Sequence, residues 1–301
     1  MLEQKIISLD ATTMNTYQSC ALKYKYQFID NLRPNLKASA LEEGDLMHKM
    51  LEVFYSLKFG LSKFDSGIWP EILESGLTLG EILDTETIIE FCQKVGLFLA
   101  TKMNAEPKDL EEVIYQFKAY MDFYKHDPWR ALAVEEVGSK VLFENENHKI
   151  IWNCKTDLVA EKGSIIAPWD HKTGKRRSTP SSLSNQFIGT CFVLGMNNIL
   201  INKIGFQKTL KESERFQRFL LTISNARIEE WRTNTIAWAL RFAKEQHFPP
   251  NLTSCDKYSG CLFEEVCTAD PNNRDYVIDK DFSTGKVWDV AKILEVGEKS
   301  E

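Results

Sequence analysis

The sequence predicts an α/β fold with a mixed central β-sheet flanked by helices. Three observations lead to this class: helical spacing of apolar residues over the first part of the chain, three strand-like segments in succession near its middle, and alternating helix-like and strand-like segments after them. That order is typical of a mixed sheet with helices packed around it. The chain has 301 residues, of which 43% are hydrophobic, so it can bury one large core or two smaller ones.

The individual elements follow from the period of the apolar residues. The expected elements are helices near 12–29 and 40–59, a mostly helical region to about 126, strands near 132–143, 149–160 and 164–172, a helix near 182–196, strands near 199–208 and 216–224, and a helix from Arg227 to about Gln246. We interpret residues 1–269 as a single domain with a helical insertion at about 60–130. Residues 270–301 are expected to form a tail packed on the body, because the segment is rich in apolar side chains.

The first strand-like segment of interest, "KIIWNCKTDLVAE", ends near a carboxylate. The alternation of a strand predicts that Asp157 lies on the face opposite to the apolar residues. The residues expected on that apolar face are Ile150, Trp152, Cys154 and Leu158. The side chain of Asp157 is therefore expected to lie outside the apolar core, near the end of the segment.

A second carboxylate and an amine follow in the next strand-like segment. A turn at Lys162–Gly163 leads to it, and Asp170 and Lys172 stand two residues apart, so both side chains point to one face. His171 is expected to point to the other face. Asp157, Asp170 and Lys172 can thus converge.

The convergence of these groups suits phosphodiester hydrolysis. A phosphodiester anion repels an incoming hydroxide, and a hard divalent cation on oxygen ligands neutralises charge and lowers the pKa of a bound water. Asp157 and Asp170 are candidate ligands of such a cation, and Lys172 is a candidate to orient or deprotonate the water. A D-x-K triplet alone is weak support, because charge pairs of this kind occur on many solvated strands.

Further polar residues accompany this pattern. His48 is expected near the start of the helix in "LEEGDLMHKMLEVFYSLKF", and Gln186 lies on the helix that follows the lysine strand. An imidazole beside two carboxylates favours Mn²⁺ or Mg²⁺. Glu135 and Glu136 are candidates for a water-mediated approach to the metal or for ordinary ion pairs.

The chain has seven cysteines, an odd number that argues against a disulfide framework and for a reducing compartment. Cys255, Cys261 and Cys267 form a C-x5-C-x5-C pattern in a loop-rich stretch, and Cys20 is the best candidate for a fourth ligand. The irregular spacing favours a 4Fe-4S cluster, with zinc as the alternative. The other three cysteines, Cys92, Cys154 and Cys191, lie in apolar patterns and are expected in the core.

Charge and hydropathy narrow the possible partners. The net charge of -6 and the pI near 5.6 do not suit a general nucleic-acid binder, although residues 170–177 and 203–218 each sum to +3. We expect these two basic runs to contribute to nucleic-acid binding. The sequence contains no apolar run near the ~20 residues that a membrane helix needs, so no membrane partner is expected.

Taken together, the motifs resemble those of the PD-(D/E)XK nuclease superfamily. They are an S/T-x-x-x-x-Y-x-x-C helix, a G-x-x-x-H-x-x-L-E helix, an Asp followed by D-x-K on two strands, a glutamine helix and a distal cysteine triplet. The order is most similar to the RecB-like branch with an iron-sulfur cluster, which includes CRISPR-associated exonucleases, the AddB nuclease domain and phage relatives. The resemblance covers roughly residues 12–268.

The resemblance implies a restriction-endonuclease-like core and a role for each matching residue. His48, Asp157, Asp170 and the main-chain carbonyl of His171 would be metal ligands, Lys172 the catalytic lysine and Gln186 the motif glutamine. Cys20, Cys255, Cys261 and Cys267 would bind a cluster that joins the N- and C-terminal segments. The sequence departs from the family pattern at Cys154–Thr156, where a glycine is usual, at Thr190, where a tyrosine is usual, and in the first cysteine gap.

The resulting hypothesis is a Mg²⁺- or Mn²⁺-dependent DNA exonuclease that acts on single-stranded or duplex ends in the cytoplasm of a prokaryotic or phage-infected cell. It would serve recombination, repair, phage DNA processing or CRISPR adaptation, with protein partners from those pathways and with self-association left open. The alternative is a catalytically weak module of the same fold that binds DNA ends without cutting.

Overall fold

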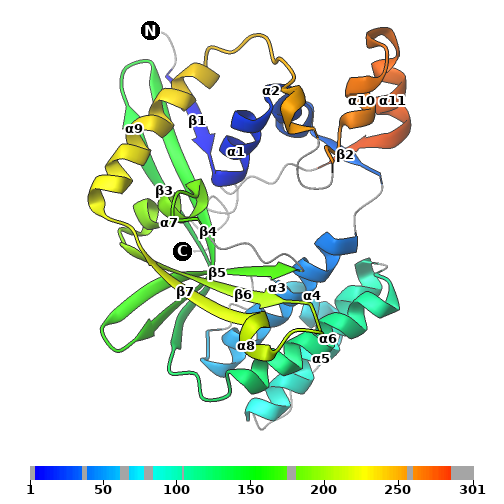
Figure 1. Cartoon of the computed structure of the whole chain (residues 1–301), viewed down its shortest axis with the longest axis vertical. Coiled ribbons are helices and arrows are strands. Elements are labelled where there is room, and N and C mark those ends of the chain that lie inside the picture. The colour runs from blue at the N-terminus through cyan, green and yellow to red at the C-terminus, as the bar shows by residue number, and fades with distance from the viewer. Residues whose placement is uncertain are drawn as a thin grey trace.

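The computed structural model describes residues 4–35, 39–61, 68–77, 84–103, 105–174, 181–255 and 260–285 (Figure 1). Its helices are α1 (Ala11–Ser19), α2 (Ala21–Tyr24), the π-helix η1 (Lys25–Ile29), α3 (Ser39–Lys58), α4 (Trp69–Glu74), α5 (Thr85–Met103), α6 (Pro107–Phe123), α7 (Asn185–Leu194), α8 (Glu212–Arg215), α9 (Asn225–Phe242), η2 (Leu252–Ser254), α10 (Glu264–Thr268), η4 (Pro271–Asn273) and α11 (Arg274–Asp281). Its strands are β1 (Lys5–Leu9), β2 (Leu32–Pro34), β3 (Arg130–Glu144), β4 (His148–Lys162), β5 (Ile165–Gly174), β6 (Asn198–Gly205), β7 (Phe216–Thr222) and β8 (Phe282–Thr284).

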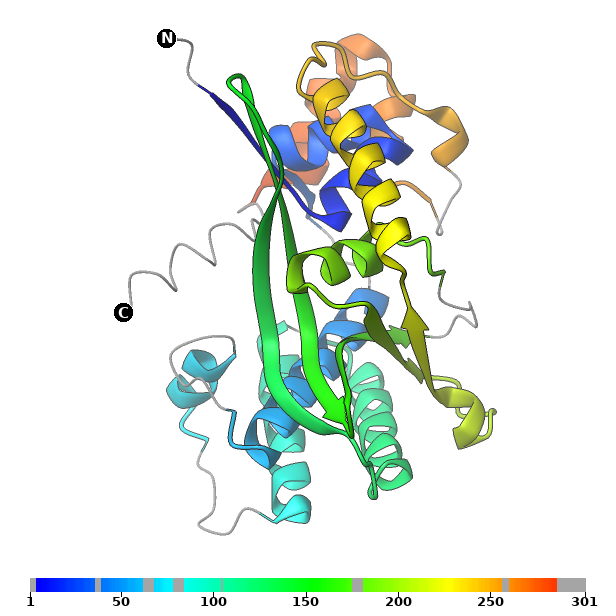
Figure 2. The same cartoon turned by 90° about the vertical axis from the view of Figure 1, so that its left-hand side faces the viewer.

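A mixed sheet forms the centre, as the sequence predicts. Among the described residues it has six strands in the order β1-β4-β5-β6-β7, with β3 on the other edge of β4. The β1–β4 and β5–β6 pairs are parallel, and the β3–β4, β4–β5 and β6–β7 pairs are antiparallel. Strands β3 and β4 form the long green hairpin in Figure 2. Strand β1, which pairs with β4 before the first helix, is not among the elements expected from the sequence.

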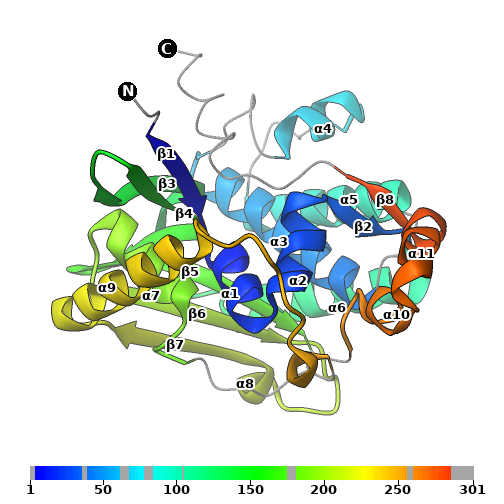
Figure 3. The same ribbon diagram turned by 90° about the horizontal axis from the view of Figure 1, so that it is seen from above.

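Helices cover both faces of this sheet (Figure 3). On one face, α3, α5 and α6 pack on β4, β5 and β6 around Trp169, Leu158 and Ile204. On the other face, α1, α7 and α9 enclose a second core that contains Trp152, Ile150 and Trp231. The flanked mixed sheet of the prediction is therefore confirmed. No helix among the described residues is long and apolar enough to cross a membrane.

The helices between residues 68 and 123 belong to the first of these cores. Phe117 and Tyr120 are fully buried there, and Tyr124 and Trp129 pack against the same cluster. Phe123 is more exposed, but its ring lies 5.6 Å from that of Phe216. These rings therefore stabilise the helical layer rather than forming an exposed surface.

The predicted helix over 12–29 is wrong in one respect, because it breaks at Cys20. The backbone of Cys20 is extended, with φ -162° and ψ 113°, so the chain turns between α1 and α2. Its Sγ accepts a hydrogen bond from the backbone N–H of Lys23 at 3.5 Å, which caps α2. A cysteine replaces the usual serine or aspartate cap.

A small third core joins segments that are distant in the sequence. Strand β2 pairs antiparallel with β8 (Figure 3). The side chains of Tyr26 and Leu32 pack with Phe263, Val266 and Phe282. The part of the expected tail from 270 to 285 takes part in this packing through α11 and β8. Residues 286–301, which include Trp288, lie outside the described residues.

Glycine at position 189 is required for the close packing of α7 on the sheet. A Cβ at Gly189 would overlap the ring of Trp152, which is 1% exposed and stacks edge-on to Trp231. We expect Gly189→Ala to lower the free energy of unfolding by about 2 kcal/mol, because neither ring has space to move. Chemical denaturation checks this.

The matched control is Gly96→Ala in α5. There the added Cβ meets only the flexible side chain of Met50, 2.9 Å from its sulfur, and alanine favours the helix. Equal destabilisation of the two variants would contradict the packing argument.

Candidate active site

Six residues singled out in the sequence meet at one place. Asp157 comes from β4, His48 from α3 and Gln186 from the first turn of α7. The other three, Asp170, His171 and Lys172, are consecutive on β5. Hydrogen bonds and ion pairs connect the set, so the structure brings all six together.

The site lies where β5 separates from β4. Their ladder ends at the Leu158–Trp169 pair, and side chains of β4 bind the backbone of β5 beyond it. Thr156 Oγ1 donates to the Trp169 carbonyl at 2.7 Å, and Asp157 Oδ2 accepts from the backbone N–H of His171 at 2.6 Å. Side chains thus replace the backbone ladder, and the strands part around the carboxylates.

The predicted alternation of β4 fails at this same place. Leu158 packs in the core of α3, α5 and α6, whereas Ile150 and Trp152 pack in the core of α7 and α9. The four apolar residues therefore do not share one face. On the neighbouring strand Glu135 has a left-handed backbone (φ 54°), and the β3–β4 pairing skips Glu135 and Asp157. This local irregularity changes which side chains face each core.

His48 reaches the site because α3 runs close to β5. A Cβ at Gly44, one turn before His48, would lie 2.9 Å from Thr173 Oγ1, so glycine permits this approach. His48 Nδ1 then lies 3.4 Å from Asp157 Oδ1, and its ring lies 5.8 Å from that of His171 in an edge-on arrangement.

Asp170, Lys172 and Gln186 form a compact triad on the other side of the site. Lys172 Nζ lies 3.1 Å from Asp170 Oδ1 and 2.8 Å from Oδ2, and it donates to Gln186 Oε1 at 2.9 Å. Gln186 Nε2 donates to Asp170 Oδ1 at 2.5 Å. Asp170 Oδ2 is buried and accepts no well-directed hydrogen bond from a described residue, although the ammonium is within ion-pair distance.

Burial and neighbouring charges shift the pKa values of the two carboxyl groups in opposite directions. Burial raises the pKa of Asp170 to about 6, against the lowering effect of Lys172. Burial also acts to raise the pKa of Asp157, but the hydrogen bond and charge of His48 outweigh it and hold that pKa well below its usual range. Desolvation would lower the pKa of His48, yet Asp157 and the other acids raise it. His48 and Asp157 thus each favour the charged form of the other.

The imidazole of His171 stays neutral. Burial lowers its pKa to about 3, and Nδ1 lies 2.9 Å from Asn202 Nδ2, which makes Nδ1 the acceptor. Asn202 also donates to the hydroxyl of Tyr120 at 2.9 Å. The buried ring of His171 is therefore tied to α6, a connection that the sequence analysis missed because no local pattern marks Asn202.

Arginine residues expected to bind nucleic acid are instead part of this interior. Arg218 forms an ion pair with Asp127 at 2.7 Å, donates to Tyr120 at 3.0 Å and lies over Tyr124 and Trp169. Arg215 is 3% exposed and donates to Gln116 at 2.6 Å. The expectation that the 203–218 run offers free cationic charge is therefore wrong for these two residues. Lys175, Arg176 and Arg177 of the other run lie outside the described residues.

Additional acids surround the site. Glu135 forms an ion pair with Lys155, and burial raises the pKa of Glu135 with a contribution from Glu52 and Asp157. Glu52, one turn after His48 on α3, is 5% exposed and accepts from the backbone N–H of Ile68 at 3.2 Å. The sequence analysis named Glu135 as a candidate near the metal but did not single out Glu52.

The donor set fits a hard cation in its chemistry. It offers the carboxylates of Asp157 and Asp170, the carbonyl of His171 and the imidazole of His48, and Asp170 Oδ2 has spare acceptor capacity. In the described part of the chain, however, no three His, Cys, Asp or Glu side chains are arranged to hold a metal ion. His48 and Lys172 occupy the carboxylates, so these two side chains would have to move apart for a cation to bind.

The four cysteines proposed as cluster ligands influence one another electrostatically, but in the described residues they are not arranged to hold a metal ion. Burial raises the pKa of Cys267, and the neighbouring thiols of Cys261, Cys20 and Cys255 raise it further. The loop before Cys255 is attached to α1 and α2: Asn251 N–H donates to Cys20 Sγ at 3.3 Å, and Ser254 Oγ donates to the Ser19 carbonyl at 2.8 Å. The other three cysteines, Cys92, Cys154 and Cys191, are buried in the core as expected.

Comparison with known proteins gives one extensive match. A sequence profile described as the PD-(D/E)XK nuclease superfamily matches residues 8–268. No curated protein matches the chain. Among solved structures, the crystal structure of SSO0001 is similar over 89% of this chain and 89% of its own, with 11% sequence identity and a TM-score of 0.38. That TM-score is too low to carry an argument, so family membership rests on the profile.

The buried carboxyl of Asp170 predicts a pH-dependent cost to stability. Its pKa rises from 3.8 to about 6 on folding, so the native protein loses stability as the pH rises through this window. We expect Asp170→Asn to approach the parent as the pH falls below 4 and to exceed its free energy of unfolding by roughly 3 kcal/mol above pH 7, without added metal. Urea unfolding at a series of pH values measures this difference.

Asp122→Asn is the control, because this α6 carboxyl is 76% exposed. Its effect should be small at every pH. An Asp170→Asn variant that is less stable than the parent at pH 8 would contradict the assignment of a net burial cost.

Proposed function

This chain belongs to the PD-(D/E)XK nuclease superfamily, and on that premise we propose that it is a Mg²⁺- or Mn²⁺-dependent DNA exonuclease. The observation that carries the proposal is the triad of Lys172, Asp170 and Gln186 beside Asp157, at the point where two strands part. A nuclease needs metal-binding carboxylates and an amine within reach of one phosphate, and this arrangement supplies both.

The proposed roles follow from the positions of the side chains. Asp157, Asp170, His48 and the His171 carbonyl would hold the cation, which when bound would polarise the phosphate and acidify a water. The imidazole of His48 in this set would favour Mn²⁺. Lys172 would leave Asp170 and hold the attacking water or the charge that develops on the phosphate. Gln186 accepts a hydrogen bond from Lys172 and would fix the direction of its amine.

The substrate we propose is DNA with a single-stranded or duplex end, processed in recombination, repair, phage DNA metabolism or CRISPR adaptation. The chain is acidic overall, and the side chains of Arg215 and Arg218 are engaged by other residues of the protein. Contact with the phosphate backbone is therefore expected to concentrate near Lys172 and its neighbours. Self-association and protein partners from these pathways belong to the same proposal.

We further propose that Cys20, Cys255, Cys261 and Cys267 bind a 4Fe-4S cluster, with a zinc ion as the alternative on the same ligands. The effect of the other three thiols on the pKa of Cys267 supports this, as does the hydrogen bond that the N–H group of Asn251 donates to Cys20 Sγ. Hydrogen bonds to cysteine sulfur are a common feature of cluster sites. The bound group would join α1 and α2 to the loop before α10.

Catalysis gives a direct test. We expect Lys172→Ala and Asp157→Ala to lower kcat by at least about 10²-fold while the fold is retained, because each removes a group at the reacting centre. End-labelled single-stranded and duplex DNA, incubated with Mg²⁺ or Mn²⁺, measures this. Lys162→Ala, an exposed lysine at the far end of β4, is the control.

Wild-type-like cleavage by Lys172→Ala would refute the site. If the unmodified protein binds DNA ends but releases no product with either metal, the alternative of a non-cutting end-binding module would replace the enzyme.

The proposed cluster predicts a visible chromophore. Protein purified without oxygen should contain iron and acid-labile sulfide, absorb in the visible, and lose both colour and thermal stability in Cys20→Ser, because the bound group closes a long loop. Cys191→Ser is the control, since that thiol is in the core. Colourless protein with one equivalent of zinc would select the alternative, and metal-free protein would reject the four-cysteine assignment.

A further inference from the structure

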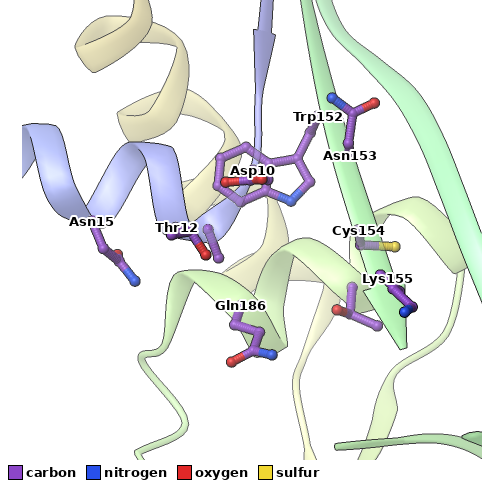
Figure 4. A pocket seen from close by; sticks show the side chains of 10 residues that line it. Asp10, Thr12, Asn15, Trp152, Asn153, Cys154, Lys155 and Gln186 are labelled. Atoms are coloured by element: carbon purple, nitrogen blue, oxygen red, sulfur yellow. The ribbon is translucent and has the colours of Figure 1, made fainter. Parts of the chain in front are cut away.

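A polar cavity of about 230 Å³ lies directly beside the proposed catalytic triad. Its wall comes from three elements: the start of α1, the middle of β4 and the first turns of α7 (Figure 4). Gln186 belongs both to this wall and to the hydrogen-bonded triad with Lys172 and Asp170. A ligand in the cavity would therefore be adjacent to the reacting phosphate of the proposed nuclease.

The cavity exists because β4 has a gap in its pairing on one edge. Strand β1 pairs with β4 from His148 to Trp152, and β5 pairs with it from Leu158 to Lys162. In the described structure neither strand pairs with the residues between these two stretches. The chain of β1 turns away into α1 at Asp10, which leaves an opening at the edge of the sheet.

The wall of this opening is polar and close to neutral. Its charged groups are Asp10, which accepts from the backbone N–H of Thr13 at 2.7 Å, and Lys155, which is paired with Glu135. The carboxylate of Asp10 disfavours a phosphate, and the lysine is already neutralised. What remains for a ligand is a set of amides and hydroxyls, which donate and accept hydrogen bonds without a net charge.

The buried part of the wall also has spare hydrogen-bonding capacity. Asn153 is 3% exposed, and its Nδ2 donates to Ser8 Oγ at 2.7 Å and to the Leu9 carbonyl at 3.2 Å. Its Oδ1 has no hydrogen-bond partner among the described residues. A buried acceptor of this kind costs free energy unless a ligand or water satisfies it. Thr12 and Asn15 are exposed at the opposite, outer part of the wall.

We propose that this cavity binds one unpaired nucleobase of the DNA strand whose backbone reaches Asp157 and Asp170. A nucleobase is neutral, carries donors and acceptors along its edge and is small enough for a pocket below the size of a drug site. The inference rests on the proposed nuclease function, and it adds a substrate preference. A base can enter only when it is not paired, so single strands or frayed ends are favoured over intact duplex.

The test is binding of single-stranded dodecamers in which one abasic residue is moved from end to end. Asp170→Asn protein, which should not cut, is titrated and fluorescence anisotropy gives Kd. We expect loss of the base at one position to weaken binding about tenfold, the effect of one or two lost hydrogen bonds, and loss at other positions to have much less effect. Adding Thr12→Trp, which fills the outer part of the cavity, should abolish this positional dependence.

Gln18→Ala is the matched control on α1. Asn185 donates to both Asn15 and Gln18, so Gln18→Ala loses one of these hydrogen bonds without altering the cavity wall. It should keep the positional dependence. A Thr12→Trp variant that still detects the abasic position would overturn the proposal.

Other outcomes separate the two inferences. Dependence on a terminal phosphate but on no base would make this a phosphate site and overturn the proposal, as would failure to bind any oligonucleotide. Cleavage by the unmodified protein without any base dependence would contradict the base-binding role of the cavity and would leave the proposed nuclease function intact. If binding depends on one base but no cleavage occurs with Mg²⁺ or Mn²⁺, the base-binding role of the cavity would be supported and the proposed nuclease function contradicted.

Discussion

The arrangement of the site depends on one hydrogen bond, from the backbone N–H of His171 to the carboxylate of Asp157. A backbone partner at this place would continue the β4–β5 ladder and close the space between the strands. Because a side chain takes the bond instead, β5 leaves β4 just before Asp170 and Lys172. The carboxylates of Asp157 and Asp170 meet at this separation, which also forms one end of the gap in the pairing of β4 beside the cavity.

Burying these carboxylates costs free energy of folding, and their hydrogen-bond and ion-pair partners offset that cost to different extents. Asp157 is charged because His48 and the His171 N–H compensate it, whereas Asp170 remains costly despite Lys172 and Gln186. A group that destabilises the fold but meets a bound cation is typical of functional sites. In the triad, the ammonium group of Lys172 offsets part of the cost of burying the Asp170 carboxylate.

Much of the fold could be predicted from the sequence, because apolar periods report burial directly. The helices from α3 to α7, helix α9 and the strands β3 to β7 fall close to their expected positions, and so do the candidate site residues on them, whereas α8, α10 and α11 were not predicted. The face of Leu158 could not be predicted, since the irregularity opposite Glu135 depends on tertiary contacts. The same holds for Asn202, whose bond to His171 joins two strands that only the folded sheet places side by side. The break at Cys20 is a third case, because its extended backbone is held by a loop far along the chain.

The attachment of that loop also determines when the molecule can be completed. Ser254 donates a hydrogen bond to the carbonyl of Ser19 across a sequence separation of 235 residues. Strand β2 can pair only after β8 has been synthesised. Contacts of such high separation form late and slowly. On a ribosome, α1 would have no lasting support until the distal loop has emerged, although the strands bearing Asp157 and Asp170 would already be complete. Completion of the cavity wall at the start of α1 is thus postponed until the segment from Ser254 to β8 has been synthesised.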